Sequence, residues 1–159
     1  CSPAPRRDGG RRSAMKVDFH TGVADKLGAA CRFLQKAQAA GASVVVCGDG
    51  RTLDRLDTAL WTFDPHSFVA HARVRGETSP APALARTPTW LVDDPASVAS
   101  RELLLNLGPA MVEGWTAFAR VVEIVSTEPA DADAGRQRWR QYSAQPGLEL
   151  VHQARGTSA

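Results

Sequence analysis

The sequence lacks a long apolar segment, paired cysteines and an excess of charge, and each absence excludes a class of protein. None of the apolar runs in its 159 residues approaches the roughly 20 residues that a helix needs to cross a bilayer. The longest runs, 44–47 and 103–105, are typical of buried strands. The sequence therefore predicts a soluble, cytoplasmic protein with no membrane-bound part.

Metal and disulfide chemistry also lack the residues that they need. The three cysteines are an odd number and form no CxxC pair, so neither a disulfide framework nor a zinc site is indicated. The four histidines are scattered along the chain, at His20, His66, His71 and His152. We therefore expect no bound metal and no cofactor.

Positive charge is concentrated at the start of the chain. The whole sequence has 19 basic and 17 acidic residues. Residues 1–14 contain four arginines and one aspartate (+3), which leaves 15 basic and 16 acidic residues (−1) for the remainder. Because sequence-independent nucleic-acid binding needs several lysines and arginines against phosphates, this composition argues against DNA as the direct ligand.

The motifs of common enzymes are incomplete. The run CGDG at 47–50 follows a predicted strand, but it lacks the length and the lysine of a Walker loop. The run LVDD at 91–94 is more simply a turn before a proline. Ser67 and His71 are four residues apart on a predicted strand, more than ~13 Å, and no GxSxG motif surrounds a serine. We expect no catalytic residue.

What the sequence does contain is an alternation of strands and helices. Strands are predicted at 16–19, 43–47, 67–72, 89–92, 102–107, 120–126 and 148–152. Helices are predicted at 25–39, from 52 to a break at Asp64-Pro65, at about 109–118 and at 128–144. The pattern predicts a single α/β domain with a mostly parallel sheet flanked by helices, Rossmann-like but without a phosphate-binding loop.

We expect this domain to occupy residues 15–152. Residues 1–14 are polar, rich in proline, glycine and arginine, and contain no apolar segment. They are therefore expected to be a disordered leader, neither a signal peptide nor an anchor, with Met15 as the natural start. Residues 153–159 are expected to form a flexible tail.

Two large aromatic residues, Trp61 and Phe68, flank the turn after the second predicted helix. Leu53, Leu56 and Leu60 follow the helical period and form one apolar stripe. Trp61 is roughly 100° from the centre of that stripe on a helical wheel, so we expect its ring at the edge of the buried face. From the residues alone, the two rings fit either the core or a contact surface.

A third aromatic residue lies between two arginines in the last predicted helix. Arg136, Trp139 and Arg140 have the spacing i, i+3 and i+4, so they share one face. They form either a solvated basic face with an inward ring or a pocket for a ligand that is both anionic and aromatic. Direct binding of single-stranded nucleic acid by stacking on Trp139 is an alternative, and a nucleotide-dependent enzyme is a weaker one.

Two patches resemble the chi subunit family of bacterial DNA polymerase III. The first is LDxALW, a proline-containing turn and SFVxH, between residues 56 and 71, and the second is RQRWRQY at 136–142. The resemblance runs from about residue 15 to 151. It implies a non-catalytic accessory subunit in DNA replication, which links psi, and hence the clamp loader, to the C-terminal tail of single-stranded DNA-binding protein.

The resemblance also implies which residues meet each partner. The psi subunit would contact Trp61 and Phe68, and a helicase is a further candidate partner at this surface. The acidic, phenylalanine-ended tail would bind to Arg136, Trp139, Arg140, Tyr142 and Leu148. DNA is then contacted only indirectly. Family members commonly have tyrosine and lysine where this chain has Trp139 and Arg140, and both exchanges keep the chemistry of the site.

Overall fold

The structure is a computed structural model that describes residues 15–62, 69–74, 89–93, 95, 98 and 101–154. The strands are β1 (Met15–Val23), β2 (Val44–Cys47), β3 (His71–Val74), β4 (Thr89–Val92), β5 (Leu103–Asn106), β6 (Arg120–Ser126) and β7 (Leu148–Ala154). The helices are α1 (Lys26–Ala39), α2 (Gly50–Thr62), α3 (Pro129–Ser143) and the short 3₁₀ helix η4 (Trp115–Ala117).

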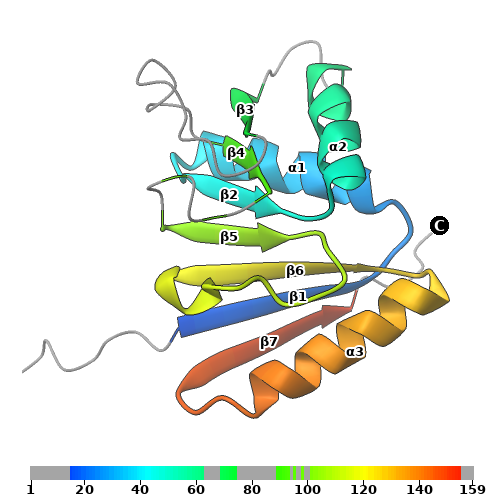
Figure 1. The fold of residues 1–159 in the computed structure, drawn as a ribbon, viewed down its shortest axis with the longest axis vertical. Coiled ribbons are helices and arrows are strands. Elements are labelled where there is room, and N and C mark those ends of the chain that lie inside the picture. Colours follow the sequence, from blue (N-terminus) through cyan, green and yellow to red (C-terminus); the bar gives the residue numbers. More distant parts are fainter. Residues whose placement is uncertain are drawn as a thin grey trace, which may run out of the picture.

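The described strands form one seven-stranded sheet in the order β3-β4-β2-β5-β6-β1-β7 (Figure 1). Every pairing between neighbouring strands is parallel. The predicted α/β fold is therefore confirmed, and the sheet is parallel throughout the described strands. The two edge strands are β3 and β7, with α2 near the first and α3 near the second (Figure 1).

Alternating side chains along the strands build two apolar layers. Leucines of α1 and α2 lie in one layer with Val46, Leu105 and Ile124. The other layer holds Phe19 and Val125, together with Tyr142 of α3. Because successive residues of a strand point to opposite faces, α3 covers the face opposite to α1 and α2.

The sequence predicted the central elements closely. All four residues of β2 are buried, as expected for a strand covered on both faces. Helix α1 begins after Asp25, whose side chain accepts a hydrogen bond from the Gly28 amide at 3.1 Å and so caps the first turn. Along α2 the predicted leucine stripe is buried: Leu53, Leu56 and Leu60.

Two predicted elements differ from the structure. The strand predicted at 67–72 begins only at His71, since the Ala70 amide donates to Gln38 Oε1 at 2.8 Å instead of joining the sheet. The helix predicted at 109–118 is wrong, because only the three residues of η4 are helical there. The Asn106 side chain donates to the Ala110 carbonyl at 2.8 Å, and Gly114 has a left-handed φ of 84°. Both features form turns, so the segment does not continue as an α-helix.

Candidate functional site

A cavity of about 630 Å³ lies between α3 and the strands β1, β6 and β7, and we call it the α3 cavity. Three of the predicted site residues, Arg136, Trp139 and Arg140, line it together. The other lining residues come from these four elements and from the position just after β6: Phe19, Thr21, Gly22, Val125, Ser126, Thr127, Ala132, Gly135 and His152. The helical spacing read from the sequence therefore does place the two guanidinium groups and the indole around one hollow.

Small residues allow α3 to lie directly on the sheet beside this cavity. A Cβ atom at Gly135 would be 2.8 Å from both Cγ atoms of Val125, closer than real contacts allow. The start of α3 is fixed by Asp131, which accepts hydrogen bonds from the Ser126 amide at 2.7 Å and from Lys26 Nζ at 3.1 Å. Although burial opposes it, these two partners hold the pKa of Asp131 below its usual value.

The indole of Trp139 forms a rigid wall of the cavity. Its ring packs edge-to-face on Phe19 at a centroid distance of 5.2 Å and on His152 at 5.7 Å. His152 is itself held in place, because its Nε2 and Thr21 Oγ1 share a hydrogen bond of 2.6 Å. Trp139 is half-buried and its position is set before any ligand arrives, which reduces the entropy lost on binding.

The two arginines differ in their availability to a ligand. Arg136 forms an ion pair with Asp133, one turn earlier on α3, and its side chain is 67% exposed. Arg140 is exposed and has no ion-pair partner among the residues that the structure describes. An exposed ion pair contributes little stability, so a carboxylate ligand can displace Asp133 at low cost. Arg140 is the cation that a ligand meets without competition.

Tyr142 and Leu148, the other two residues that the resemblance places in this site, do not line the cavity. Tyr142 is 1% exposed and packs against Phe19 at a centroid distance of 5.6 Å and against Trp115 at 5.0 Å. Burial, followed by the nearby Glu123 carboxylate, raises the pKa of its hydroxyl. Leu148 is half-buried in the same apolar cluster. Tyr142 therefore supports the cavity from beneath through its contact with Phe19.

Sequence reasoning missed a buried ion pair under α3. Arg138, only 1% exposed, donates from Nε to Glu123 Oε2 at 2.7 Å and from Nη1 to the Pro109 carbonyl at 2.8 Å. Burial raises the pKa of Glu123 to about 7, against the opposing effect of Arg138. Two signals were available: Glu123 interrupts an apolar strand, and Arg138 falls on the inward stripe of Gly135 and Tyr142.

The second predicted surface lies at the other edge of the sheet. Trp61 is 64% exposed at the end of α2, and its ring contacts His71 of β3 at a centroid distance of 5.4 Å. His71 is fixed by Asp57, 2.8 Å from Nε2, and by the Val69 carbonyl, 2.7 Å from Nδ1. The expectation that Trp61 lies off the buried stripe is confirmed. Phe68 lies outside the described residues.

Neither a metal cluster nor a membrane segment is found among the residues that the structure describes. These residues contain no group of three or more histidine, cysteine, aspartate or glutamate side chains placed to hold a metal ion. Within the same residues, no helix is both long enough and apolar enough to cross a membrane.

Comparison with known proteins places the chain in a family. The model of the family described as "DNA polymerase III chi subunit, HolC" matches residues 15–150. DNA polymerase III subunit chi of Pseudomonas aeruginosa is 32% identical over 138 residues, which cover 82% of this chain and 90% of that protein. Subunit chi of Escherichia coli K12 is 30% identical over 100 residues, 62% of this chain and 65% of that protein. The chain therefore belongs to the family of DNA polymerase III chi subunits, which serve in DNA replication.

Proposed function

We propose that this chain is a non-catalytic adaptor in the DNA polymerase III complex, and that its α3 cavity binds the acidic, phenylalanine-ended tail of single-stranded DNA-binding protein. The observation that carries this proposal is the convergence of Arg136, Trp139 and Arg140 on one cavity. Guanidinium groups bind carboxylates through charge-assisted hydrogen bonds, and aromatic walls take up an apolar ring. A peptide that ends in phenylalanine offers both features at its last residue.

The different surroundings of the two arginines assign them different tasks. Arg140, without an ion-pair partner among the described residues, binds the terminal carboxylate of the tail. Arg136, which is paired with Asp133, exchanges that partner for an acidic side chain earlier in the tail. The phenylalanine ring then packs against Trp139 over the floor formed by Phe19 and Val125.

The same proposal assigns the psi subunit to the surface around Trp61. With 64% of its surface exposed, Trp61 is the one large hydrophobic residue that is exposed among the residues described. Exposed aromatic side chains of this size are the usual anchors of protein interfaces. The strands β3 and β7 are the two edges of the sheet (Figure 1). Trp61 contacts His71 of β3, and the α3 cavity is lined by His152 of β7. Two partners can therefore bind at once, with the whole sheet between them.

Titration calorimetry with a synthetic acidic peptide that ends in phenylalanine tests the assignment of the α3 cavity. Arg140→Glu should abolish binding, because it removes the principal cation and places a carboxylate against the ligand. Trp139→Ala should weaken binding by roughly 1 to 3 kcal/mol through lost apolar contact. Raising the salt concentration should reduce the affinity without removing it, since the aromatic contact is not screened.

Arg55→Glu, an equal change of charge on the exposed surface of α2, is the matched control and should leave peptide binding unchanged. A peptide without its terminal phenylalanine should bind weakly to every variant. Unchanged peptide affinity in Arg140→Glu would overturn the proposal. If an oligonucleotide bound more tightly than the peptide and Arg140→Glu abolished that binding, the site would instead be a stacking platform for single-stranded nucleic acid.

A further inference from the structure

A second cavity, of about 270 Å³, lies on the opposite face of the same strands, between α1 and the strands β6, β1 and β7. We call it the α1 cleft. It is lined by His20, Val23, Ala29, Arg32, Phe33, Lys36, Arg120, Ile124 and Gln153. No residue of this cleft takes part in either of the two partner surfaces proposed above.

Basic side chains from a helix and a strand converge on the α1 cleft. Arg32 and Lys36 are one turn apart on α1, are exposed, and have no ion-pair partner among the described residues. Arg120 reaches the cleft from the start of β6, with 42% of its side chain exposed. It pairs with the buried carboxylate of Asp18 through Nε and Nη2, which offsets part of its charge, so Arg32 and Lys36 are the principal cations of the cleft. The nearby Lys16, 3.8 Å from Asp18, adds a further cation at this end of the sheet.

The remaining lining indicates which kind of anion fits. Phe33 is half-buried, so part of its ring faces the cleft, and Val23, Ala29 and Ile124 supply apolar surface. The Gln153 side chain adds an amide that can donate or accept hydrogen bonds. Cations that follow a backbone, combined with an aromatic ring, are the features that bind single-stranded nucleic acid. An acidic peptide without aromatic side chains would use the cations but would gain little from the ring.

The position of the cleft relative to the α3 cavity gives it a function. His152 lines the α3 cavity and its neighbour Gln153 lines the α1 cleft, and the same alternation separates Phe19 from His20. The two hollows therefore lie back to back across one sheet. On the proposed function, the tail held in the α3 cavity belongs to a protein that covers single-stranded DNA. Tethering then raises the local concentration of the DNA strand, up to the millimolar range for short flexible linkers.

We propose that the α1 cleft binds the phosphodiester backbone of single-stranded DNA through Arg32, Lys36 and Arg120. The DNA bound there is the same DNA strand that is covered by the protein whose tail occupies the α3 cavity. With so few cations the contact is weak on its own, which agrees with the slight negative charge of residues 15–159. It becomes effective once the tail tethers the chain to the DNA. The cleft then fixes how the adaptor is oriented on that strand.

The test is binding of a fluorescently labelled oligothymidylate to the full chain, followed by fluorescence anisotropy over a range of salt concentrations. The variant is Arg32→Ala with Lys36→Ala, and its affinity at low salt should fall about tenfold. The slope of log affinity against log salt should become shallower by about 1.4, since each phosphate contact on a single strand contributes roughly 0.7.

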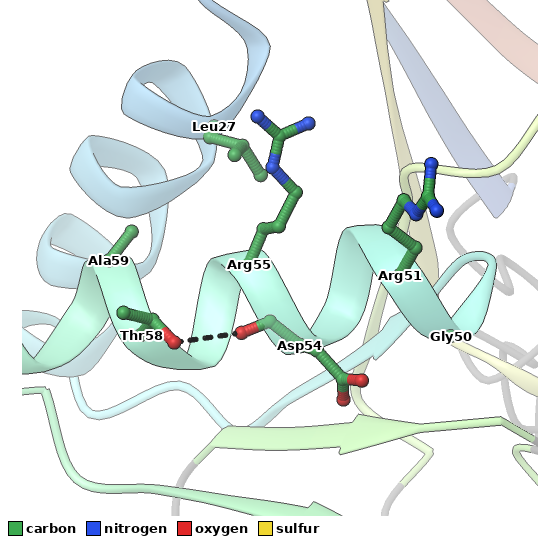
Figure 2. A pocket seen from close by; sticks show the side chains of 7 residues that line it. All are labelled: Leu27, Gly50, Arg51, Asp54, Arg55, Thr58 and Ala59. Atoms are coloured by element: carbon green, nitrogen blue, oxygen red, sulfur yellow. Dashed lines mark hydrogen bonds between the residues drawn. The ribbon is translucent and has the colours of Figure 1, made fainter.

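Arg51→Ala with Arg55→Ala on α2 is the matched control. These two arginines are also one turn apart and exposed, and they line an open hollow of about 780 Å³ with Leu27 and Ala59 (Figure 2). Asp54 lies between them in sequence, and its carboxylate points away from both guanidinium groups in the same view. The control should keep the affinity and the salt slope of the unaltered chain. Equal losses in both variants would show only a general charge effect and would overturn the proposal.

Further measurements distinguish DNA binding at the α1 cleft from the binding of an acidic protein or of a simple anion. No detectable oligothymidylate binding by the unaltered chain at low salt would overturn it. A polyglutamate peptide that lost affinity in the Arg32 and Lys36 variant, while oligothymidylate did not, would assign the cleft to an acidic protein and also overturn it. Inorganic phosphate that competes as well as oligothymidylate would reduce the cleft to a simple anion site. Tail-peptide binding should remain intact in this variant, so a failure of the α3 assignment would be detected separately.

Discussion

Trp61 and Trp139 make the same contact in two different settings. Each ring packs edge-to-face on a histidine of an edge strand, His71 of β3 for Trp61 and His152 of β7 for Trp139. Trp139 is half-buried, also contacts Phe19, and lines a cavity with two arginines. Trp61 is 64% exposed at the end of its helix. The first setting suits a small ligand that inserts into a formed site, and the second suits a partner that covers an exposed ring.

The difference extends beneath the two rings. Under α3, the buried pair of Arg138 and Glu123 ties the helix to the centre of the sheet and to the Pro109 carbonyl. Under α2, the leucine stripe makes the buried contact with the sheet, and Asp57 and Asp54 pair with His71 and Arg73 of edge strand β3. The two aspartates of α2 are 33% and 43% exposed, whereas both side chains of the pair under α3 are buried. A charge pair that is removed from water is costly to break, so it holds the orientation of α3 more firmly.

The largest expected effect on stability comes from removing the buried ion pair under α3. Arg138→Ala should destabilise the domain by about 3 to 5 kcal/mol, because it leaves the buried Glu123 carboxylate without its partner. Urea denaturation measures the loss. Arg136→Ala, two residues away on the exposed face, is the control and should change stability by no more than about 0.5 kcal/mol. If the two variants lost equal stability, the buried pair would not be what holds α3 in place.

A smaller effect is expected for the ring that forms the cavity wall. Trp139→Ala should cost roughly 1 to 3 kcal/mol of stability, because the half-buried indole loses its contacts with Phe19 and His152. Trp139→Phe keeps an aromatic ring and should recover part of the loss. The same denaturation series measures both variants. A stability equal to that of the unaltered chain in Trp139→Ala would mean that the ring is not a fixed wall.

The buried pair also predicts that the stability of the domain depends on pH. The pKa of Glu123 is about 7 in the folded protein, above its ordinary value of 4.5, so the folded form holds this proton more tightly than the unfolded form. Its contribution to stability should therefore decrease as the pH rises from about 4.5 to about 7. Glu123→Gln should remove this decrease. The comparison uses the slope of unfolding free energy against pH, and equal slopes in the two proteins would contradict it.

The sequence predicted the features that depend on local periodicity. Strand β2 was evident from its unbroken apolar run, and the shared face of Arg136, Trp139 and Arg140 followed from helical spacing. Features that depend on tertiary contacts were missed. The start of β3 is set by Gln38 from α1, a contact between residues 32 positions apart.

The inward direction of Arg138 was missed for a related reason. A charged side chain in a polar helix is normally exposed, and the burial of Arg138 becomes favourable through the Glu123 carboxylate and the Pro109 carbonyl, which both lie outside the helix. The resemblance places Tyr142 in the tail pocket, which stays a prediction, and the structure buries its side chain on the same stripe as Gly135. The order of the strands depends on contacts of the whole sheet, and no local pattern contains it.

The smallest expected effect on stability concerns Trp61, the exposed member of the two tryptophans. Trp61→Ala should change the free energy of unfolding by no more than about 0.5 kcal/mol, because most of its ring is already in water. Its effect should instead fall on the psi subunit, with binding weakened by about 1 to 4 kcal/mol, as for an aromatic anchor. Calorimetry with purified psi measures the binding, and urea denaturation measures the stability. Phe68→Ala is expected to weaken the binding of psi in the same way. Trp139→Ala, at the opposite edge of the sheet, is the control and should leave psi binding intact. If Trp61→Ala unfolded the domain and left psi binding unaffected in the folded fraction, the ring would be a structural residue, and the two tryptophans would differ in exposure alone and not in function.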